Sequence, residues 1–188
     1  MRQKNEQDSS WHRISNRKFS FFLPFKMLLE KKISPKENRQ NLKQLLATLH
    51  LKHTQSLELC AIIREGIRKK VGLQRIKEYT DWRYATQLSP FFEMQKTHVF
   101  PILGFEDQFI KKALAKQRRI KKHCTKNIEL AKALSRIEED LEELVRLEEK
   151  KIFTGLDENI TPNQILSILE IFSEKTDISE PWDDIFWK

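Results

Sequence analysis

Residues Ser89–Gly104 of the chain read SPFFEMQKTHVFPILG, a stretch whose apolar residues recur at helical spacing. Phe91, Gln95 and Val99 lie four residues apart, which places them on one face of an α-helix. Pro90 falls inside this pattern and predicts a kink, or a break into two helices. Gln95 is a polar residue on a face that is otherwise apolar, and other segments of the chain share this feature.

Three further segments show the same periodicity. Apolar residues recur at helical spacing over 42–67, 109–128 and 133–152, and the stretch above belongs to a pattern that begins near residue 73. Each segment is long enough to span a small domain, and the short connections favour antiparallel neighbours. The sequence therefore predicts an all-α fold, with an antiparallel up-down-up-down four-helix bundle over residues 39–153.

The two flanks of this region differ in character. Residues 1–38 are polar, basic and irregular, and they predict a loosely ordered arm. Residues 154–188 predict a short extra helix, with Thr161 as its N-cap and Pro162 at its first position, followed by an aromatic tail. We expect this tail to pack on the bundle as a lid, with docking on a partner as the alternative.

The composition favours a helical protein in a reducing compartment. Only 4 glycines and 6 prolines occur in 188 residues, too few for a protein of many strands. Cys60 and Cys124 have no CxxC partner, so we expect neither a zinc site nor a disulfide scaffold, and we predict a cytoplasmic location. No apolar run is long enough to span a membrane, and the patch within residues 17–32 lacks a signal-peptide cleavage site.

One hydrogen-bonding residue interrupts each of the four apolar faces. These residues are His53, Gln95, Gln117 and Glu148. A buried polar group without a partner costs about 1–3 kcal/mol, so such groups tend to cluster and satisfy one another. The pattern predicts a common polar centre among the helices, and the alternative is that single members lie at the edge of a face and reach water.

Several stretches together resemble the hemerythrin-like (HHE cation-binding) family of the bacterial type, from about Leu45 to the C-terminus. They read LHLKHTQSLELCAIIREGI, RIKEYTDW, LSPFFEMQKTHVFPILG, IKKALAKQRRIKKH, LEELVRLEEKKIF and PWDDIFWK. The resemblance implies an antiparallel four-helix bundle in which histidines and carboxylates from all four helices hold two irons. Members of the family bind oxygen, sense it or handle iron.

Most ligand positions that this resemblance implies are substituted. His53 and Glu148 retain the ligand type and are interpreted as vestigial metal ligands. The other four positions hold residues that are poor ligands or lack a donor, namely Phe91, Gln95, Gln117 and Leu144. One carboxylate cannot offset the charge of two irons in a dry core, so we expect no cofactor. The alternative is a residual site for one or two iron ions.

A hydrogen-bonded network is the physical alternative to the metal centre. A lone carboxylate in an apolar core is unfavourable unless donors or a cation meet it. We therefore hypothesise a hydrogen bond between His53 and Glu148, completed by the amides of Gln95 and Gln117.

A basic run precedes the last long helical segment. It contains Lys111, Lys112, Lys116, Arg118, Arg119, Lys121 and Lys122. We interpret it as a solvated helix face that pairs with the acidic run RIEEDLEELVRLEE, because no aromatic residues are interleaved to stack on bases. His50, His98 and His123 lie off the central positions and are expected at the surface.

The sequence contains no glycine-rich phosphate loop, no nucleophile–base pair and no paired catalytic carboxylates, so we do not expect an enzyme. The preferred interpretation is a hemerythrin-like bundle with a degenerate di-iron site and a binding, structural or regulatory role, with an unknown protein as the possible partner. The alternatives are a residual metal protein that senses or handles iron or oxygen, and a basic adaptor for nucleic acid or an acidic protein. Nucleic acid is the less favoured partner.

Overall fold

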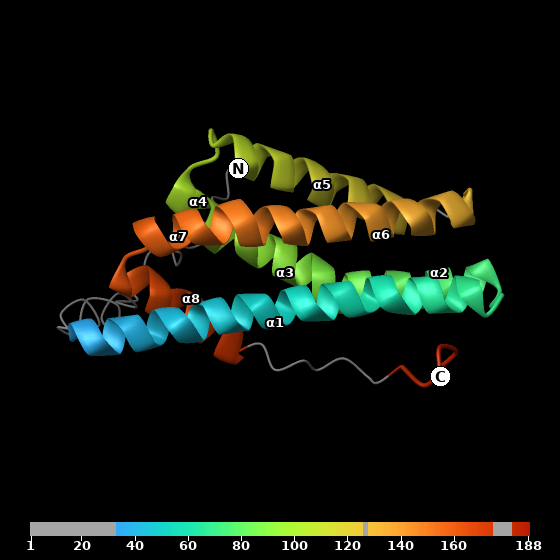
Figure 1. Cartoon of the computed structure of the whole chain (residues 1–188), viewed down its shortest axis with the longest axis horizontal. Coiled ribbons are helices and arrows are strands. Elements are labelled where there is room, and N and C mark those ends of the chain that lie inside the picture. Colours follow the sequence, from blue (N-terminus) through green and yellow to red (C-terminus); the bar gives the residue numbers. More distant parts are fainter. Residues whose placement is uncertain (1–32, 126–127, 175–181) are drawn as a thin grey trace, which may run out of the picture. The chain divides into compact units, whose positions relative to one another are not determined.

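The computed structural model describes residues 33–125, 128–174 and 182–188, and within these ranges all regular secondary structure is helical (Figure 1). The helices belong to a compact unit that spans Ser34–Lys188. The predicted arm falls outside the described residues as far as residue 32. Its predicted end at residue 38 is wrong, because α1 already begins at Pro35.

Helix α1 spans Pro35–Arg68 and is the longest helix of the described unit. Ser34 caps it, since the Ser34 hydroxyl accepts a hydrogen bond from the backbone N–H of Glu37 at 3.2 Å. Proline is tolerated at the first helical position, because a backbone N–H at that position would have no partner inside the helix. The helix therefore starts where a hydroxyl side chain and a proline both favour a start.

The second long segment runs through two prolines without breaking. It comprises α2 (Leu73–Arg83), a π-helical turn at Tyr84–Leu88, α3 (Ser89–Met94), a second π-turn at Gln95–Val99, and α4 (Phe100–Leu103). The predicted break at Pro90 is absent, because a π-turn precedes the proline and the segment stays helical through it. The predicted kink stays a prediction. Gly104 then ends the segment with φ of 87°.

Two further long segments complete the core. Helix α5 spans Gln108–Cys124 and is capped by Asp107. Helix α6 spans Leu130–Leu147 and continues through a π-turn at Glu148–Ile152 into α7 (Phe153–Asn159), so this segment extends past its predicted end at residue 153.

The predicted short extra helix is confirmed. Helix α8 spans Pro162–Glu174, and the hydroxyl of Thr161 accepts a hydrogen bond from the backbone N–H of Gln164 at 3.4 Å. Proline again occupies the first helical position, as the sequence predicts.

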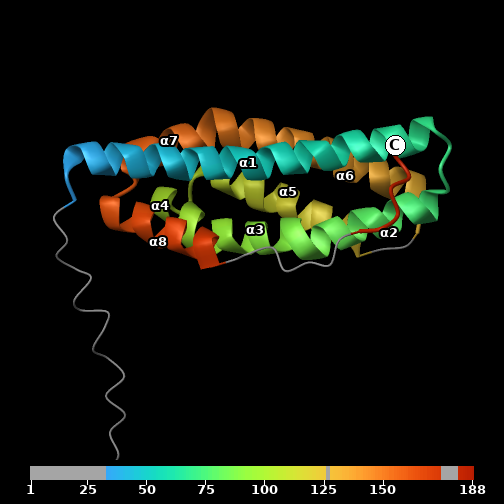
Figure 2. The same cartoon turned by 90° about the horizontal axis from the view of Figure 1, so that it is seen from below.

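The four long segments lie side by side, and successive segments run in opposite directions (Figures 1 and 2). Helix α1 contacts α2 and α6, and α5 contacts the same two helices, while α8 packs against α1. Apolar residues from every segment fill the space between them. No helix among the described residues is long and apolar enough to cross a membrane.

The C-terminal residues 182–188 pack on the outside of α1 and α2, which confirms the expected lid. Phe186 is buried and makes an edge-on contact with Tyr79, with ring centroids 5.7 Å apart. Arg75 of α2 forms an ion pair with Asp184. A Cβ atom at Gly66 of α1 would lie 2.9 Å from the Phe186 ring, so the absence of a side chain there permits the close approach.

A buried polar network as the candidate functional site

The four polar residues predicted to share a centre meet in the core. His53, Gln95, Gln117 and Glu148 are all buried, with exposed fractions of 2%, 0%, 7% and 1%. They come from α1, the π-turn at Gln95–Val99, α5 and the π-turn at Glu148–Ile152, one from each long segment. The predicted convergence of these side chains is therefore present.

The hydrogen bonds of this polar network converge on the carboxyl group of Glu148. The Nε2 atom of His53 lies 2.7 Å from Oε2 of Glu148. The Gln95 amide nitrogen donates to the same Glu148 oxygen at 2.6 Å, and the Gln117 amide nitrogen donates to the Gln95 oxygen at 2.9 Å. The hypothesised bond between His53 and Glu148, with both glutamines completing it, is thus confirmed. Oε1 of Glu148 is buried and has no hydrogen-bond partner among the described residues.

Two members of the polar network begin π-helical turns. Gln95 is the first residue of one π-turn and Glu148 is the first residue of another. A π-turn closes its hydrogen bonds over five residues, as between the Phe100 N–H and the Gln95 carbonyl. The altered turn changes the direction in which nearby side chains project, and such turns are frequent at functional sites.

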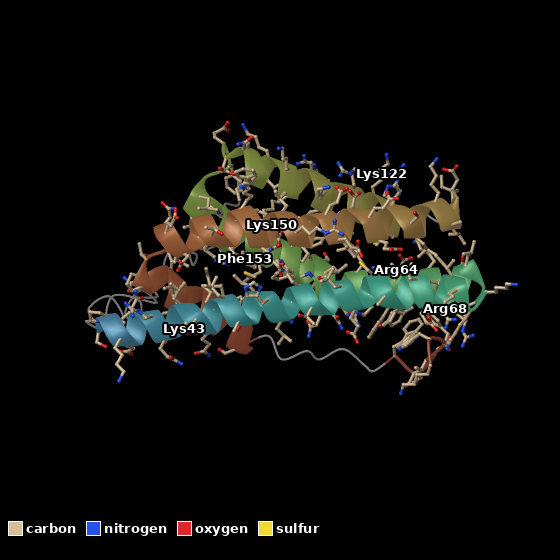
Figure 3. The ribbon with its side chains drawn as sticks, viewed as in Figure 1. Lys43, Arg64, Arg68, Lys122, Lys150 and Phe153 are labelled. Atoms are coloured by element: carbon tan, nitrogen blue, oxygen red, sulfur yellow. The ribbon has the colours of Figure 1, made fainter. Side chains whose placement is uncertain are left out.

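Aromatic and aliphatic side chains enclose the polar network. The His53 ring stacks on Phe153, with centroids 4.8 Å apart and an interplanar angle of 8°. Phe153 belongs to the fourth long segment, on the side that faces α1 (Figure 3). Phe91 meets the edge of His53 with centroids 6.2 Å apart. Phe91 and Leu144 are both buried, so these two predicted positions form part of the apolar core.

The other nitrogen of His53 faces a second group of side chains. Its Nδ1 atom lies 3.3 Å from Oε1 of Glu149, and Nδ1 of His50 lies 3.4 Å from the same oxygen. The donor atoms of His50, His53 and Glu149 all lie within 4.8 Å of one another. We call these three residues the edge cluster. His50 is exposed, as the sequence predicts, and Glu149 was not among the predicted site residues. The His50-x-x-His53 spacing, which places both rings on one helix face, was the signal in the sequence.

The expectation of one buried polar residue per helix is incomplete. Lys77 is fully buried and binds both carboxylate oxygens of Asp81 at 2.7 Å, and it also donates to the backbone carbonyl of Cys124. Arg83 and Asp140 are buried as well. Long side chains can bury their methylene groups while their charged ends meet partners, so a lysine or arginine in a sequence does not by itself mark an exposed position.

The predicted basic run is mostly a solvated helix face, and part of it pairs with α6. Lys116 and Arg119 form ion pairs with Asp140, and Lys116 also pairs with Glu143. Hydrogen bonding to Asp140 raises the pKa of Arg119 above its usual value. The remaining members are exposed, and Figure 3 shows Lys122 on the outer side of α5; they are Lys111, Lys112, Arg118, Lys121 and Lys122.

The two cysteines are buried free thiols. Burial is the main cause that raises the pKa of Cys60 to about 12, and burial likewise raises the pKa of Cys124 to about 12. A thiol with such a pKa is protonated near neutral pH and is a poor nucleophile. Neither cysteine is therefore a candidate for covalent chemistry.

Comparison of the chain with models of known protein families, with curated proteins and with solved structures gives no significant match. The polar network and the edge cluster are therefore the features that bear on function.

Proposed function

We propose that the chain is a hemerythrin-like, antiparallel four-helix bundle with a degenerate di-iron site, and that it serves as a non-catalytic binding, structural or regulatory protein. The observation that carries the proposal is the polar network. Its four members stand at four of the six positions where the family resemblance implies metal ligands. They bond to one another at distances of 2.6–2.9 Å.

The arrangement of the helices supports the bundle. Helix α1 contacts α2 and α6, α5 contacts the same two helices, and α2 also contacts α6. Contact of each long segment with the segment that follows it in the chain is expected of an up-down-up-down bundle with short connections.

The residues of the core do not fit two irons. Phe91 and Leu144 offer no donor atoms and pack as core, and the Gln95 amide already uses both of its ends. Glu148 is the only carboxylate among the six positions, and its Oε2 atom accepts from two donors. Two irons bring far more positive charge than one carboxylate offsets in a buried site. We therefore derive no reaction that depends on iron.

The charge distribution supports a protein partner over nucleic acid. Part of the basic run is neutralised by Asp140 and Glu143 of the neighbouring helix, which lowers its capacity to release counterions from a phosphate backbone. Buried free thiols suit a reducing compartment, so a cytoplasmic location belongs to the same proposal.

Metal analysis tests the proposed loss of iron. Protein produced in iron-rich medium should contain no di-iron centre and should lack the visible absorption of oxo-bridged iron. Two irons per chain together with that absorption would overturn the proposal.

Restoring the missing ligands tests the hemerythrin-like frame. The variant Phe91→His/Gln95→Glu/Gln117→His/Leu144→His supplies a donor at each substituted position, and it should gain iron when the natural chain does not. The matched control carries only Phe91→His and Leu144→His, which leaves one carboxylate and should not hold two irons. A fully helical quadruple variant that takes up no iron would count against the frame.

A further inference from the structure

We propose that the edge cluster, formed by His50, His53 and Glu149, binds one zinc ion between α1 and the fourth long segment. The site shares only His53 with the six positions discussed above, and its other two residues, His50 and Glu149, are not among them. Two imidazoles and one carboxylate form a donor set that suits Zn²⁺, with a fourth position available to water.

The distances within the edge cluster match those between ligands of a tetrahedral zinc ion. Zinc–nitrogen and zinc–oxygen bonds of about 2.0–2.2 Å place any two ligand atoms of a tetrahedron about 3.3–3.6 Å apart. The Glu149 Oε1 atom lies 3.3 Å from Nδ1 of His53 and 3.4 Å from Nδ1 of His50. These two edges of the tetrahedron are therefore already present, and the ligand atoms of all three residues lie within 4.8 Å of one another.

The polar network supplies the outer support that a zinc-binding histidine needs. Histidine ligands usually donate their other ring N–H to a carboxylate, which fixes the tautomer and the orientation of the ring. Nε2 of His53 faces the Glu148 carboxyl at 2.7 Å, and Gln95 holds that carboxyl at 2.6 Å. With the proton on Nε2, the lone pair of His53 is on Nδ1 and points toward Glu149. Stacking on Phe153 further restricts the ring.

Charge and access favour a cation at the edge cluster. Two carboxyl groups, Glu148 and Glu149, flank the His53 ring, and Glu148 is buried. A divalent ion on Nδ1 would compensate both, because Coulomb interactions are strong at this range in a partly buried site. The side chains of His50 and Glu149 are 53% and 40% exposed, so the site has an open path from solvent.

Calorimetric titration of the full-length, untagged chain with zinc chloride tests the proposal. We expect one Zn²⁺ per chain, and Co²⁺ as a substitute should give the ligand-field spectrum of a four-coordinate site. His50→Ala and Glu149→Gln should each weaken zinc binding at least tenfold. His98→Ala and Glu139→Gln are matched controls, because both residues are exposed and lie outside the cluster, and they should leave the affinity unchanged.

A second measurement separates ligation from simple surface binding. Zinc should raise the melting temperature of the natural chain and of both control variants, and it should not raise that of His50→Ala. Absence of stoichiometric zinc binding would overturn the proposal, as would binding that both cluster variants retain in full. Either result can be told apart from the outcome of the iron analysis, because the substituted residues His50 and Glu149 are not among the six positions.

Discussion

Replacing His53 with phenylalanine removes both ring nitrogens and keeps an aromatic ring that can stack on Phe153. Glu148 then loses the donor at 2.7 Å and retains the Gln95 amide as its partner. Removing one partner of a buried hydrogen bond usually costs about 1–3 kcal/mol, because the remaining polar group stays buried. We therefore expect His53→Phe to lower the free energy of unfolding by about 1–3 kcal/mol.

Replacing Glu148 with methionine tests the opposite member of the same pair. The donors of His53 and Gln95 then remain buried without an acceptor, and each costs about 1–3 kcal/mol. The double variant His53→Phe/Glu148→Met leaves only the Gln95 donor unpaired. Its loss should be smaller than the sum of the single losses, by a coupling energy of about 1.5–3 kcal/mol, the magnitude of a hydrogen bond to a carboxylate.

Urea unfolding followed by far-ultraviolet circular dichroism measures these free energies for all four members of the cycle. A parallel cycle on Arg136 and Glu139, an exposed ion pair on α6, is the matched control. Its coupling should stay below about 0.5 kcal/mol. If the His53 and Glu148 losses simply add to within about 0.5 kcal/mol, the two side chains do not interact as described and the reasoning is refuted.

Three further predictions concern the rest of the core and the tail. Cys60 and Cys124 should resist thiol reagents in the folded chain. Burial raises the pKa of both thiols from 9.0 to about 12. The contribution of the buried thiols to stability is therefore complete below pH 9.0 and is lost as the pH rises toward about 12. The urea midpoint should fall over that pH window. Gly66→Ala should cost about 1–3 kcal/mol in thermal unfolding, because the new Cβ would lie 2.9 Å from the Phe186 ring. Asp184→Asn should loosen the tail without detaching the buried Phe186, as measured by tryptophan fluorescence. In the natural chain the bond from Arg75 lowers the pKa of Asp184 below 3.8, so the contact is complete above that pH and is lost as the pH falls through the lowered pKa.

Each of these three predictions has a result that contradicts it. Rapid labelling of either cysteine in the folded chain would mean that the thiols are accessible. An unchanged melting temperature for Gly66→Ala would mean that neither the Phe186 ring nor the Ile76 side chain approaches Gly66 as closely as described. Identical acid titrations of fluorescence for the natural chain and Asp184→Asn would mean that Asp184 does not hold the tail.

The helical segments and the polar network were predictable from the sequence because both depend on periodicity. Apolar residues that recur every three or four positions mark the helix face that packs in the core. Polar residues at those same positions, such as His53 and Gln117, therefore also point inward. The packing of the tail was predictable because exposure of the aromatic rings of Phe186 and its neighbours to water is unfavourable.

The π-turns and the edge cluster were not predictable in the same way. A π-turn adds one residue to a helical turn, and the apolar pattern of these helices tolerates that extra residue. The sequence around Gln95 and Glu148 therefore does not reveal the π-turns that begin there. Whether Glu149 reaches His50 depends on how α1 and the fourth segment pack and on side-chain rotamers. Both are tertiary properties, and residue order along the chain does not fix them.

Anomalous diffraction from crystals of protein produced in iron-rich medium tests the central claim most directly. We expect no iron peak among His53, Gln95, Gln117 and Glu148, with these side chains within hydrogen-bond distance of one another. An iron peak at that position, with His53 and Glu148 turned toward it as ligands, would contradict the proposed loss of the di-iron site.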